Sequence, residues 1–329
     1  MIISKTPLRA SFFGGGTDFA AYFHESRFGY GSVISTALGM HVYITVNKRF
    51  DGQIRVVYNG NELVDHVDQV KHNIIREALK ITGIETGVEV VYMADLPMTD
   101  LGVGLASSSA LAVGVLNALH AYKGEYVTAS QLAKEAIEIE IGRLGQQIGI
   151  QDQYAVAVGG FNRYLFNSDD TVTVTPAVYD MKIREKLCSN LLMFYTGKSR
   201  DSRAIFKEQK ETTKTHKADV LDPLVEATDI AMKALSSGDL DKWGHLLRDT
   251  WELKKKFASG VSNPDIDDMY DRATGAGALG GKILGAGGGG FLLVYVPQDK
   301  QSAVREALHD FREVPFSMDM QGSRIIFAD

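Results

Sequence analysis

The chain has 329 residues, of which 45% are hydrophobic and 23% are charged, and its formal net charge is −6. This composition is typical of a globular protein with one large or two ordinary domains, and we expect two. The net negative charge gives no sign of a basic surface that would bind nucleic acid or anionic lipid, so we expect neither as a partner. A single cysteine, no signal-peptide pattern and no apolar run long enough to span a bilayer favour a cytoplasmic protein without membrane contact.

The elements predicted along the chain are a mixture of strands and helices. Residues rich in β-branched and aromatic side chains predict strands at 42–46, 54–58, 88–92, 171–175, 191–195, 291–296 and 324–327. Helical periodicity predicts helices at 70–82, 110–122, 129–144, 223–236, 240–257, 264–276 and 300–311. The early strands come in adjacent pairs without strict alternation with helices, which favours an α+β architecture over a doubly wound parallel sheet. A charged, turn-prone segment at 178–186 predicts a boundary between domains 1–180 and 181–329.

Glycine is concentrated in three short segments, and each is flanked by strand-like or helix-like sequence. The chain has 33 glycines, and the segments that gather them are 13–18, 102–110 and 280–290. None of the three has the composition of a low-complexity linker. We therefore expect tight functional loops at these places.

The middle glycine segment, 102–110, contains three serines and runs into the predicted helix 110–122. Backbone N–H groups at a helix N-terminus carry partial positive charge, and small side chains let an anion approach them. The segment lacks the lysine of a Walker A loop and departs from the dinucleotide-binding pattern at Ser107. The segment is compatible with a phosphate-binding turn. It is equally compatible with an ordinary helix cap, in which the serines bond the helix's own donors.

The predicted helix 129–144 carries a carboxylate within its apolar face. The apolar stripe consists of Leu132, Ala133, Ala136, Ile137, Ile141 and Leu144. Glu140 falls near the centre of this stripe, so its side chain is predicted to be buried. A buried carboxylate is costly unless it meets a cation, a metal ion or several hydrogen-bond donors. A metal site and a salt bridge to a nearby arginine would each satisfy that requirement.

A second acidic residue follows shortly after this helix. Asp152 lies between two glutamines in what the sequence indicates is a short loop, and Gly159 and Gly160 come after it. A carboxylate in such a place can act as a base or orient a hydroxyl group. An Asx turn or a helix cap is the structural alternative.

Several short motifs occur in a fixed order along the chain. They are Pro7-Leu8-Arg9 leading to Gly14-Gly15-Gly16-Thr17-Asp18, then Gly102-x-Gly104-Leu105-x-Ser107-Ser108, then Glu140 and Asp152-Gln153, then Gly285-Ala286-Gly287-Gly288-Gly289. This ordered set resembles the GHMP kinase superfamily of galactokinase, homoserine kinase, mevalonate kinase and phosphomevalonate kinase. The resemblance covers nearly the whole chain. It implies an N-terminal domain like ribosomal protein S5 domain 2, a C-terminal ferredoxin-like domain and an active site between them.

The resemblance also implies ATP and Mg²⁺ as cofactors of a phosphoryl transfer. The turn around the ATP phosphates would consist of Gly102, Val103, Gly104, Leu105, Ala106, Ser107, Ser108 and Ser109. Ser108 and Glu140 would hold Mg²⁺, which would supply the cation that a buried Glu140 needs. Ala106 stands where most members of the superfamily carry glycine, and a small residue is tolerated there unless the position needs a positive φ.

Two charged residues would carry the chemistry that the resemblance implies. Asp152 would accept or orient the proton of the acceptor hydroxyl, and Arg9 would keep that carboxylate ionised and offset charge on the transferred group. The expected acceptor contacts are Gly15, Gly16, Thr17, Asp18, Arg200, Gly287 and Gly288. The third glycine segment, 280–290, would let bare backbone close on both substrates, although a simple β-turn before the strand 291–296 explains it too.

The first motif resembles one branch of the superfamily in particular. Pro7-Leu8-Arg9 followed by Gly-Gly-Gly-Thr-Asp is similar to the branch that contains D-glycero-D-manno-heptose 7-phosphate kinases and the kinase domain of fucokinases. This implies transfer of the γ-phosphate of ATP to O1 of the heptose 7-phosphate, giving the 1,7-bisphosphate. Arg200, with Lys198 and Arg203, would bind the phosphate already on this sugar phosphate partner, and a solvated charged loop is the alternative. We expect a monomer or a homodimer.

Two other functions are compatible with the same motifs. A fucokinase-like or other free-sugar kinase of this superfamily would keep every catalytic residue and differ in the acceptor pocket. A catalytically silent sensor that binds sugar and ATP is the alternative from another class. The presence of Ser108, Glu140, Asp152 and Arg9 together favours an enzyme, because a sensor needs neither the metal pair nor the acid.

Overall fold

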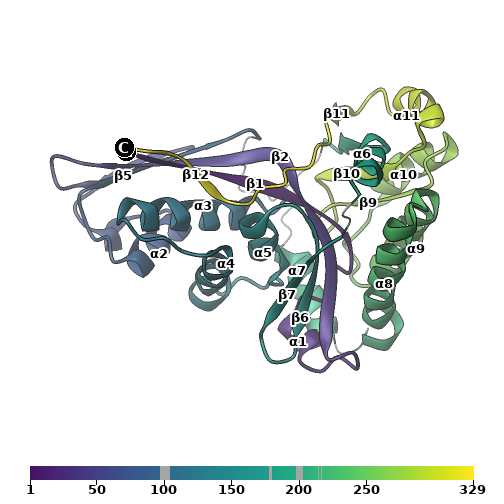
Figure 1. Cartoon of the computed structure of the whole chain (residues 1–329), viewed down its shortest axis with the longest axis horizontal. Helices are drawn as coiled ribbons and strands as arrows, with labels where there is room; N and C mark the ends of the chain where they lie inside the picture. Colours follow the sequence, from purple (N-terminus) through teal and green to yellow (C-terminus); the bar gives the residue numbers. More distant parts are fainter. Residues whose placement is uncertain (97–103, 178–179, 198–202, 214, 216) are drawn as a thin grey trace.

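The protein is described by a computed structural model that covers residues 1–96, 104–177, 180–197, 203–213, 215 and 217–329. Strands gather into two sheets, and helices pack against both (Figure 1). The predicted α+β class is therefore confirmed. In the part of the chain that the structure describes, no helix combines the length and apolar character needed to cross a membrane.

The larger sheet has eight strands and contains both ends of the chain. Its order is β12-β1-β2-β5-β3-β4, and β6 pairs with both β2 and β7. Its strands are β1 (Ile2–Phe13), β2 (Tyr30–Lys48), β3 (Ile54–Val57), β4 (Asn61–Val64), β5 (Val88–Ala94), β6 (Phe161–Asn167), β7 (Val172–Pro176) and β12 (Arg324–Ala328). All neighbouring pairs are antiparallel except β3 and β5. The long strand β2 pairs with β6 through its first half and with β5 through its second half, so it organises the whole sheet.

Helices cover one face of this sheet (Figure 1). They are α2 (Asn73–Thr82), α3 (Ser107–Tyr122), α4 (Ala129–Ile137), the π-helix η2 (Glu138–Arg143) and α5 (Gln151–Val158), with the short α1 (Ala20–Phe23) and η1 (Val67–Gln69) outside this group. Helix α3 is apolar on nearly all sides and is buried against β1, β2 and the neighbouring helices. Its first turn is thereby fixed near the middle of β1, where the site lies.

The smaller sheet has four antiparallel strands in the order β11-β8-β10-β9. They are β8 (Leu191–Tyr195), β9 (Gly280–Ile283), β10 (Phe291–Tyr295) and β11 (Arg312–Val314). The helices of this part are α6 (Met181–Ser189), α7 (Arg203–Thr212), η3 (Lys217–Leu221), α8 (Asp222–Ser237), α9 (Leu240–Lys255), α10 (Pro264–Gly275), η4 (Gln298–Lys300) and α11 (Gln301–Ala307). Trp243 of α9 packs edge-on between Phe12 and Phe13 of β1, with ring centroids 4.9 and 5.1 Å apart. The ring of Trp243 also lies 6.1 Å from that of Tyr295 of β10, so one aromatic cluster joins the two sheets.

Several elements differ from the sequence-based expectation. Residues 178–186 were predicted as a turn-prone segment, yet helix α6 begins at Met181, with Asp180 capping its first N–H groups. Asp152 was predicted in a loop, yet it lies in the first turn of α5. The domain boundary near residue 180 stays a prediction. The last strand, β12, lies beside β1 in the first sheet, so the chain returns at its end to where it began.

Candidate active site

A buried ion pair joins strand β1 to helix α5. Arg9, in the middle of β1, is 3% exposed, and its guanidinium donates two hydrogen bonds to the carboxylate of Asp152, at 2.8 and 2.9 Å. A third hydrogen bond runs from Arg9 to the carbonyl oxygen of Gly104 at 2.7 Å. The side chain of Asp152 remains 19% exposed. The bidentate contact therefore fixes the orientation of a carboxylate that is still accessible to solvent and ligands.

Two cavities meet at this ion pair. The large cavity has about 1700 Å³ of empty space, including open solvent, and is lined by residues 104 and 106–109, residues 144–148 and the third glycine segment. The small cavity has about 420 Å³ of empty space, open solvent again included, and is lined by the first glycine segment together with Phe206, Gln209 and Lys254. Arg9 and Asp152 line both cavities. A ligand in the large cavity can therefore meet a ligand in the small cavity at the carboxylate of Asp152.

The serine turn, residues 104–109, opens onto the large cavity at the start of α3. The N-cap residue of α3 is Ala106, and among the described residues no N-cap side chain bonds the first N–H groups of the helix. The hydroxyls of Ser108 and Ser109 donate to Glu140 instead, so the helix-cap alternative for the serines is wrong. The uncapped backbone N–H groups at this terminus are the donors with which helices bind anions. Gly102 and Val103, predicted for the same turn, lie outside the described residues.

Ala106 adopts a left-handed conformation, with φ of 60° and ψ of 35°. This is the condition under which a residue other than glycine is strained, at a cost of about 1–2 kcal/mol. Ala106→Gly should raise the free energy of unfolding by up to about 1 kcal/mol, after glycine's greater backbone entropy is subtracted. Urea denaturation would measure the change. Ala121→Gly, in the last turn of the same helix, should lower the free energy of unfolding by about 0.5–1 kcal/mol. Equal effects of the two substitutions would show that the backbone at Ala106 is not strained.

Glu140 is fully buried, as predicted, but it lies in a wider helical turn than the sequence indicates. Helix α4 ends at Ile137 and continues as the π-helix η2. A π-helix has more residues per turn than an α-helix, so the apolar stripe shifts along the chain. Ile139 and Glu140 are the buried residues of this turn, whereas Ile141 is half-buried.

Two hydroxyls and one amide surround the carboxylate of Glu140. Ser108 and Ser109 donate to its two oxygens, the second at 2.7 Å, and Gln153 Nε2 donates at 2.6 Å. Burial raises the pKa of Glu140, these three hydrogen bonds lower it, and the charge of Asp152 raises it further. Among the residues that the structure describes, no cation contributes to its surroundings, so the predicted alternative of a salt bridge is not found there.

An Mg²⁺ ion fits the chemistry of these donors. Carboxylate and hydroxyl oxygens are ligands that Mg²⁺ accepts, and Ser108 reaches the large cavity. Within the described ranges no cluster of three or more His, Cys, Asp or Glu side chains could hold a metal ion by itself. A site with one carboxylate is the kind that Mg²⁺ completes with water and substrate phosphates. Ser108 and Glu140 are the residues that would hold it.

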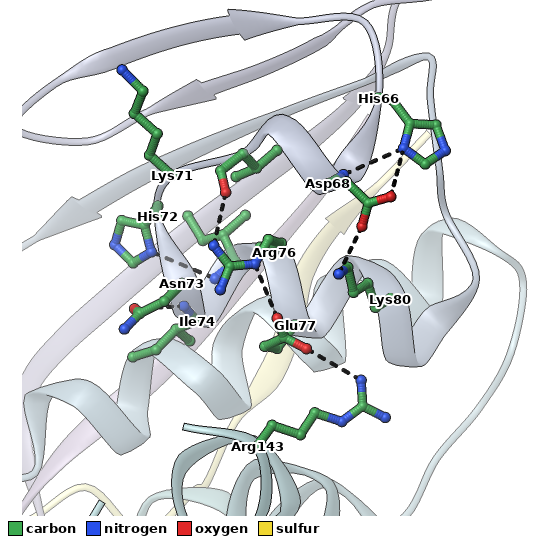
Figure 2. A network of polar contacts seen from close by, with 12 residues as sticks. His66, Asp68, Lys71, His72, Asn73, Ile74, Arg76, Glu77, Lys80 and Arg143 are labelled. Atoms are coloured by element: carbon green, nitrogen blue, oxygen red, sulfur yellow. Dashed lines mark hydrogen bonds and ion pairs between the residues drawn. The ribbon is translucent and has the colours of Figure 1, made fainter. Parts of the chain in front are cut away.

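An ion pair ties the π-helix to helix α2 (Figure 2). Arg143, at the end of η2, donates to the carboxylate of Glu77 at 3.4 Å, and Arg76 donates to the same carboxylate at 3.0 Å. Asn73, the first residue of α2, lines the large cavity. Helix α2 therefore anchors the segment that carries Glu140 and also forms part of the cavity wall.

The first glycine segment presents Asp18 to the small cavity. The side chain of Asp18 is buried, and it accepts hydrogen bonds from the backbone N–H groups of Gly16 at 3.0 Å and Gln151 at 3.3 Å. Burial raises the pKa of Asp18, and the charge of Asp152 raises it further, although the backbone hydrogen bonds oppose both effects. Gly15 and Gly16 line the same cavity. These three predicted acceptor residues are thus brought together beside Asp152.

Thr17 is not brought to either cavity. Its hydroxyl is directed at the carbonyl oxygens of Gly14 and Ser32, at 2.8 and 3.0 Å, and accepts from the N–H of Ser32 at 2.9 Å. Thr17 is fully buried in this arrangement. It therefore fastens the first glycine segment to strand β2, and the geometry gives its predicted contact with an acceptor no support.

The third glycine segment touches the serine turn through bare backbone. A Cβ on Gly104 would lie 2.3 Å from the carbonyl oxygen of Leu284, and a Cβ on Gly285 would lie 2.5 Å from Cα of Gly104. Both glycines also have positive φ, so no other residue fits here without a shift of the backbone. Gly287 lines the large cavity, whereas Gly288 lines a separate small pocket.

Two of the residues predicted to bind the sugar phosphate lie outside the described residues, whereas a lysine that was not predicted lines the small cavity. Arg200 and Lys198 lie outside the described residues, so the cationic pocket stays a prediction. Lys254 lines the small cavity although the sequence interpretation did not select it. It shares the buried stripe of α9 with Leu247 and Trp251, so the helical spacing that revealed Glu140 could also have revealed this residue.

Comparisons with known proteins agree with this architecture. The family model of the GHMP kinases N terminal domain matches residues 68–160, and that of the GHMP kinases C terminal domain matches residues 231–313. The crystal structure of a D-glycero-D-manno-heptose 1-phosphate kinase from Bacteroides thetaiotaomicron superposes with a TM-score of 0.77. That structure and this chain are 25% identical, and the match covers 100% of both.

Two curated relatives are similar over nearly the whole of this chain. The D-glycero-alpha-D-manno-heptose 7-phosphate kinase of Campylobacter jejuni is 31% identical over 324 residues, which covers 93% of each protein. The L-fucokinase/L-fucose-1-P guanylyltransferase of Bacteroides fragilis is 27% identical over 348 residues, covering 93% of this chain and 35% of that protein. The family models, the full-length similarity and the shared two-domain fold together establish that this chain belongs to the GHMP kinase family.

Proposed function

We propose that this GHMP kinase transfers the γ-phosphate of ATP to O1 of D-glycero-D-manno-heptose 7-phosphate and releases ADP and the heptose 1,7-bisphosphate. The observation that carries the proposal is the meeting of the two cavities at Arg9 and Asp152. The large cavity suits the nucleotide, since the uncapped start of α3 faces it. The small cavity suits the sugar, since polar groups of several elements line it.

The residues around the junction have complementary tasks in this proposal. The N-terminus of α3 and the backbone of the serine turn bind the phosphates of ATP. Asp152 takes up the proton of the O1 hydroxyl while the new O–P bond forms and the bond to ADP breaks. Arg9 holds the carboxylate in place through its paired hydrogen bonds. Mg²⁺, when bound by Ser108 and Glu140, neutralises charge on the phosphates.

The heptose acceptor is favoured by the similarity to heptose phosphate kinases. These two relatives differ in the position of the phosphate that their names give, at O7 in one and at O1 in the other. A free-sugar kinase is the second candidate, because the L-fucokinase of Bacteroides fragilis is similar over 93% of this chain. The two candidates share the phosphoryl-transfer residues and differ in the acceptor.

An assay of ADP release with a panel of sugars tests the proposal. The panel contains heptose 7-phosphate, unphosphorylated D-glycero-D-manno-heptose, D-mannose and L-fucose, each with ATP and Mg²⁺. We expect the highest kcat/KM with heptose 7-phosphate, and phosphorus NMR should place the new phosphate on O1. Faster turnover of an unphosphorylated sugar would establish the second candidate. Sugar binding without any ATP turnover would mean that the protein is a sensor.

A further inference from the structure

Lys254, at the C-terminal end of α9, is a buried lysine that forms no ion pair with a carboxylate of the described residues. It is 7% exposed and lies on the apolar stripe of its helix. Its Nζ donates one hydrogen bond, at 2.7 Å, to the carbonyl oxygen of Gly285. Within the described part of the chain, Lys254 takes part in no ion pair within 4.0 Å. A buried ammonium is costly unless its other hydrogens find acceptors, so this environment is incomplete without a ligand.

Two further polar side chains point at the same space as Lys254. A Cβ placed on Gly15 would lie 3.7 Å from Lys254 Nζ and 3.8 Å from both Gln151 Nε2 and Ser11 Oγ. The Ser11 hydroxyl and the side-chain carbonyl of Gln151 are buried and lack hydrogen-bond partners among the described residues. Buried polar atoms are rarely left unpaired in a folded protein. Ser11 of β1, Gln151 of α5 and Lys254 of α9 thus direct polar atoms at a space that stays open because Gly15 has no side chain.

The charges around this space favour a hydroxyl over a phosphate as the ligand group. Asp18 and Asp152 line the same small cavity, and Arg9, the second cation there besides Lys254, already donates two hydrogen bonds to Asp152. A phosphate there would be repelled by these two carboxylates. A pair of neighbouring hydroxyls can instead donate to a carboxylate such as Asp18 and accept from the ammonium of Lys254.

We propose that Lys254, Ser11 and Gln151 form a subsite that binds hydroxyl groups of the sugar acceptor, and that Lys254 is a determinant of acceptor specificity. This inference rests on the proposed function for the identity of the ligand as a sugar. It adds a contact from α9, in the second half of the chain, to the contacts of the first glycine segment. Since Lys254 also bonds to Gly285, sugar binding is linked to the glycine segment that touches the serine turn.

The pKa of Lys254 gives the subsite a pH dependence. Burial and the neighbouring charge of Arg9 lower this pKa to about 8, while Asp18 and Asp152 oppose the shift. Lys282, another buried lysine whose charge interacts with Lys254, donates to the carbonyl oxygen of Phe12 at 3.0 Å. Lys254 carries its charge below pH 8 and loses it above, so acceptor affinity should fall as the pH rises through that value. The fall should be absent when Lys254 is replaced by methionine.

Lys254→Met tests the subsite, because methionine is an unbranched side chain only one atom shorter than lysine and has no donor. Calorimetric titrations with ADP and Mg²⁺ present would use two probes, heptose 7-phosphate and unphosphorylated D-glycero-D-manno-heptose. We expect the dissociation constant of both probes to be at least about 10-fold higher for Lys254→Met than for the wild type. In steady-state kinetics, the KM for ATP should change less than about twofold. Lys255→Met, at the adjacent and partly exposed lysine, should bind both probes like the wild type.

Gly15→Ala is a second test that does not alter any charge. The added methyl would lie at ordinary contact distances from its neighbours, and Gly15 does not have positive φ, so the variant should fold. The methyl would fill the space where the sugar hydroxyl binds, and the affinity for both probes should fall by at least about 10-fold, the scale of losing a hydrogen bond to a charged group. Gly275→Ala, where a Cβ meets nothing within 4 Å, is the matched control.

The outcomes separate this subsite from the proposed function. Weaker binding of both probes to Lys254→Met and Gly15→Ala supports the subsite, even if the wild type transfers no phosphate to O1. In that case the proposed function alone would be wrong. A loss confined to heptose 7-phosphate would show that Lys254 binds phosphate and would overturn the inference. Wild-type affinity in both variants, or a wild type that binds neither sugar, would also overturn it.

Discussion

Asp152→Asn should lower kcat at least about a hundredfold, because an amide cannot take up the proton of the acceptor hydroxyl. Asparagine keeps one oxygen that can accept from Arg9, so the ion pair becomes a weaker hydrogen bond and the side chain stays in place. We expect the variant to fold, with a loss of about 1–3 kcal/mol in the free energy of unfolding. Steady-state kinetics with ATP and heptose 7-phosphate, together with urea denaturation, would measure both effects.

Asp229→Asn is the matched control for this change. Asp229 also pairs with an arginine, Arg163, at 2.7 Å, and it lines neither the large nor the small cavity. Its replacement should leave kcat within about twofold of the wild type, as expected for a residue that does not stabilise the transition state. Unchanged turnover in Asp152→Asn would exclude its role as the base, whatever happens to stability.

Glu140→Gln should lower kcat by about 10²–10³-fold, because it removes the anionic ligand of the candidate Mg²⁺ site. The same change should leave the metal-free protein as stable as the wild type or more so. Glu140 is a buried charge with no cation beside it in the described structure, and a neutral amide of the same shape avoids the cost of burying that charge.

A thermal melt would separate these two effects without any measurement of turnover. With ADP present, Mg²⁺ should raise the melting temperature of the wild type, and Glu140→Gln should show little of that increase. Glu138→Gln, an exposed glutamate in the same π-helix, should respond to Mg²⁺ like the wild type. An equal increase in Glu140→Gln and the wild type would mean that Glu140 is no metal ligand.

The sequence was sufficient for those parts of the site that depend on helical periodicity. Glu140 was placed in the core because its neighbours on the helix face are apolar, and this holds although a π-helix shifts the stripe to include Ile139. The π-helix itself could not be predicted, since its extra residue per turn leaves no separate pattern in the sequence. Lys254 satisfies the same periodicity in α9, but it begins a run of three lysines, 254–256, and runs of like charge are usually solvated.

Contacts between separate elements could not be predicted from the sequence. Thr17 lies in a motif typical of ligand binding, yet its hydroxyl bonds to the backbone of Gly14 and to that of Ser32, which is 15 residues away in strand β2. The pattern around Asp152, with two flanking glutamines and two glycines shortly after it, favoured a loop, but residues from Gln151 onward form a helix. The meeting of Arg9 with Asp152 depends on how β1 and α5 pack, which no local pattern specifies.

The contact between Gly104 and Gly285 has a consequence for attempts to change the substrates of this enzyme. Two distant parts of the chain meet there with no side chain between them. The distance between the serine turn and the third glycine segment is accordingly set by the thickness of the main chain, which point mutations do not adjust. Efforts to broaden the range of sugars should begin at Phe206, whose side chain lines both cavities at their meeting point, rather than at Gln209, which donates a hydrogen bond to the carbonyl oxygen of Ala286 beside that junction.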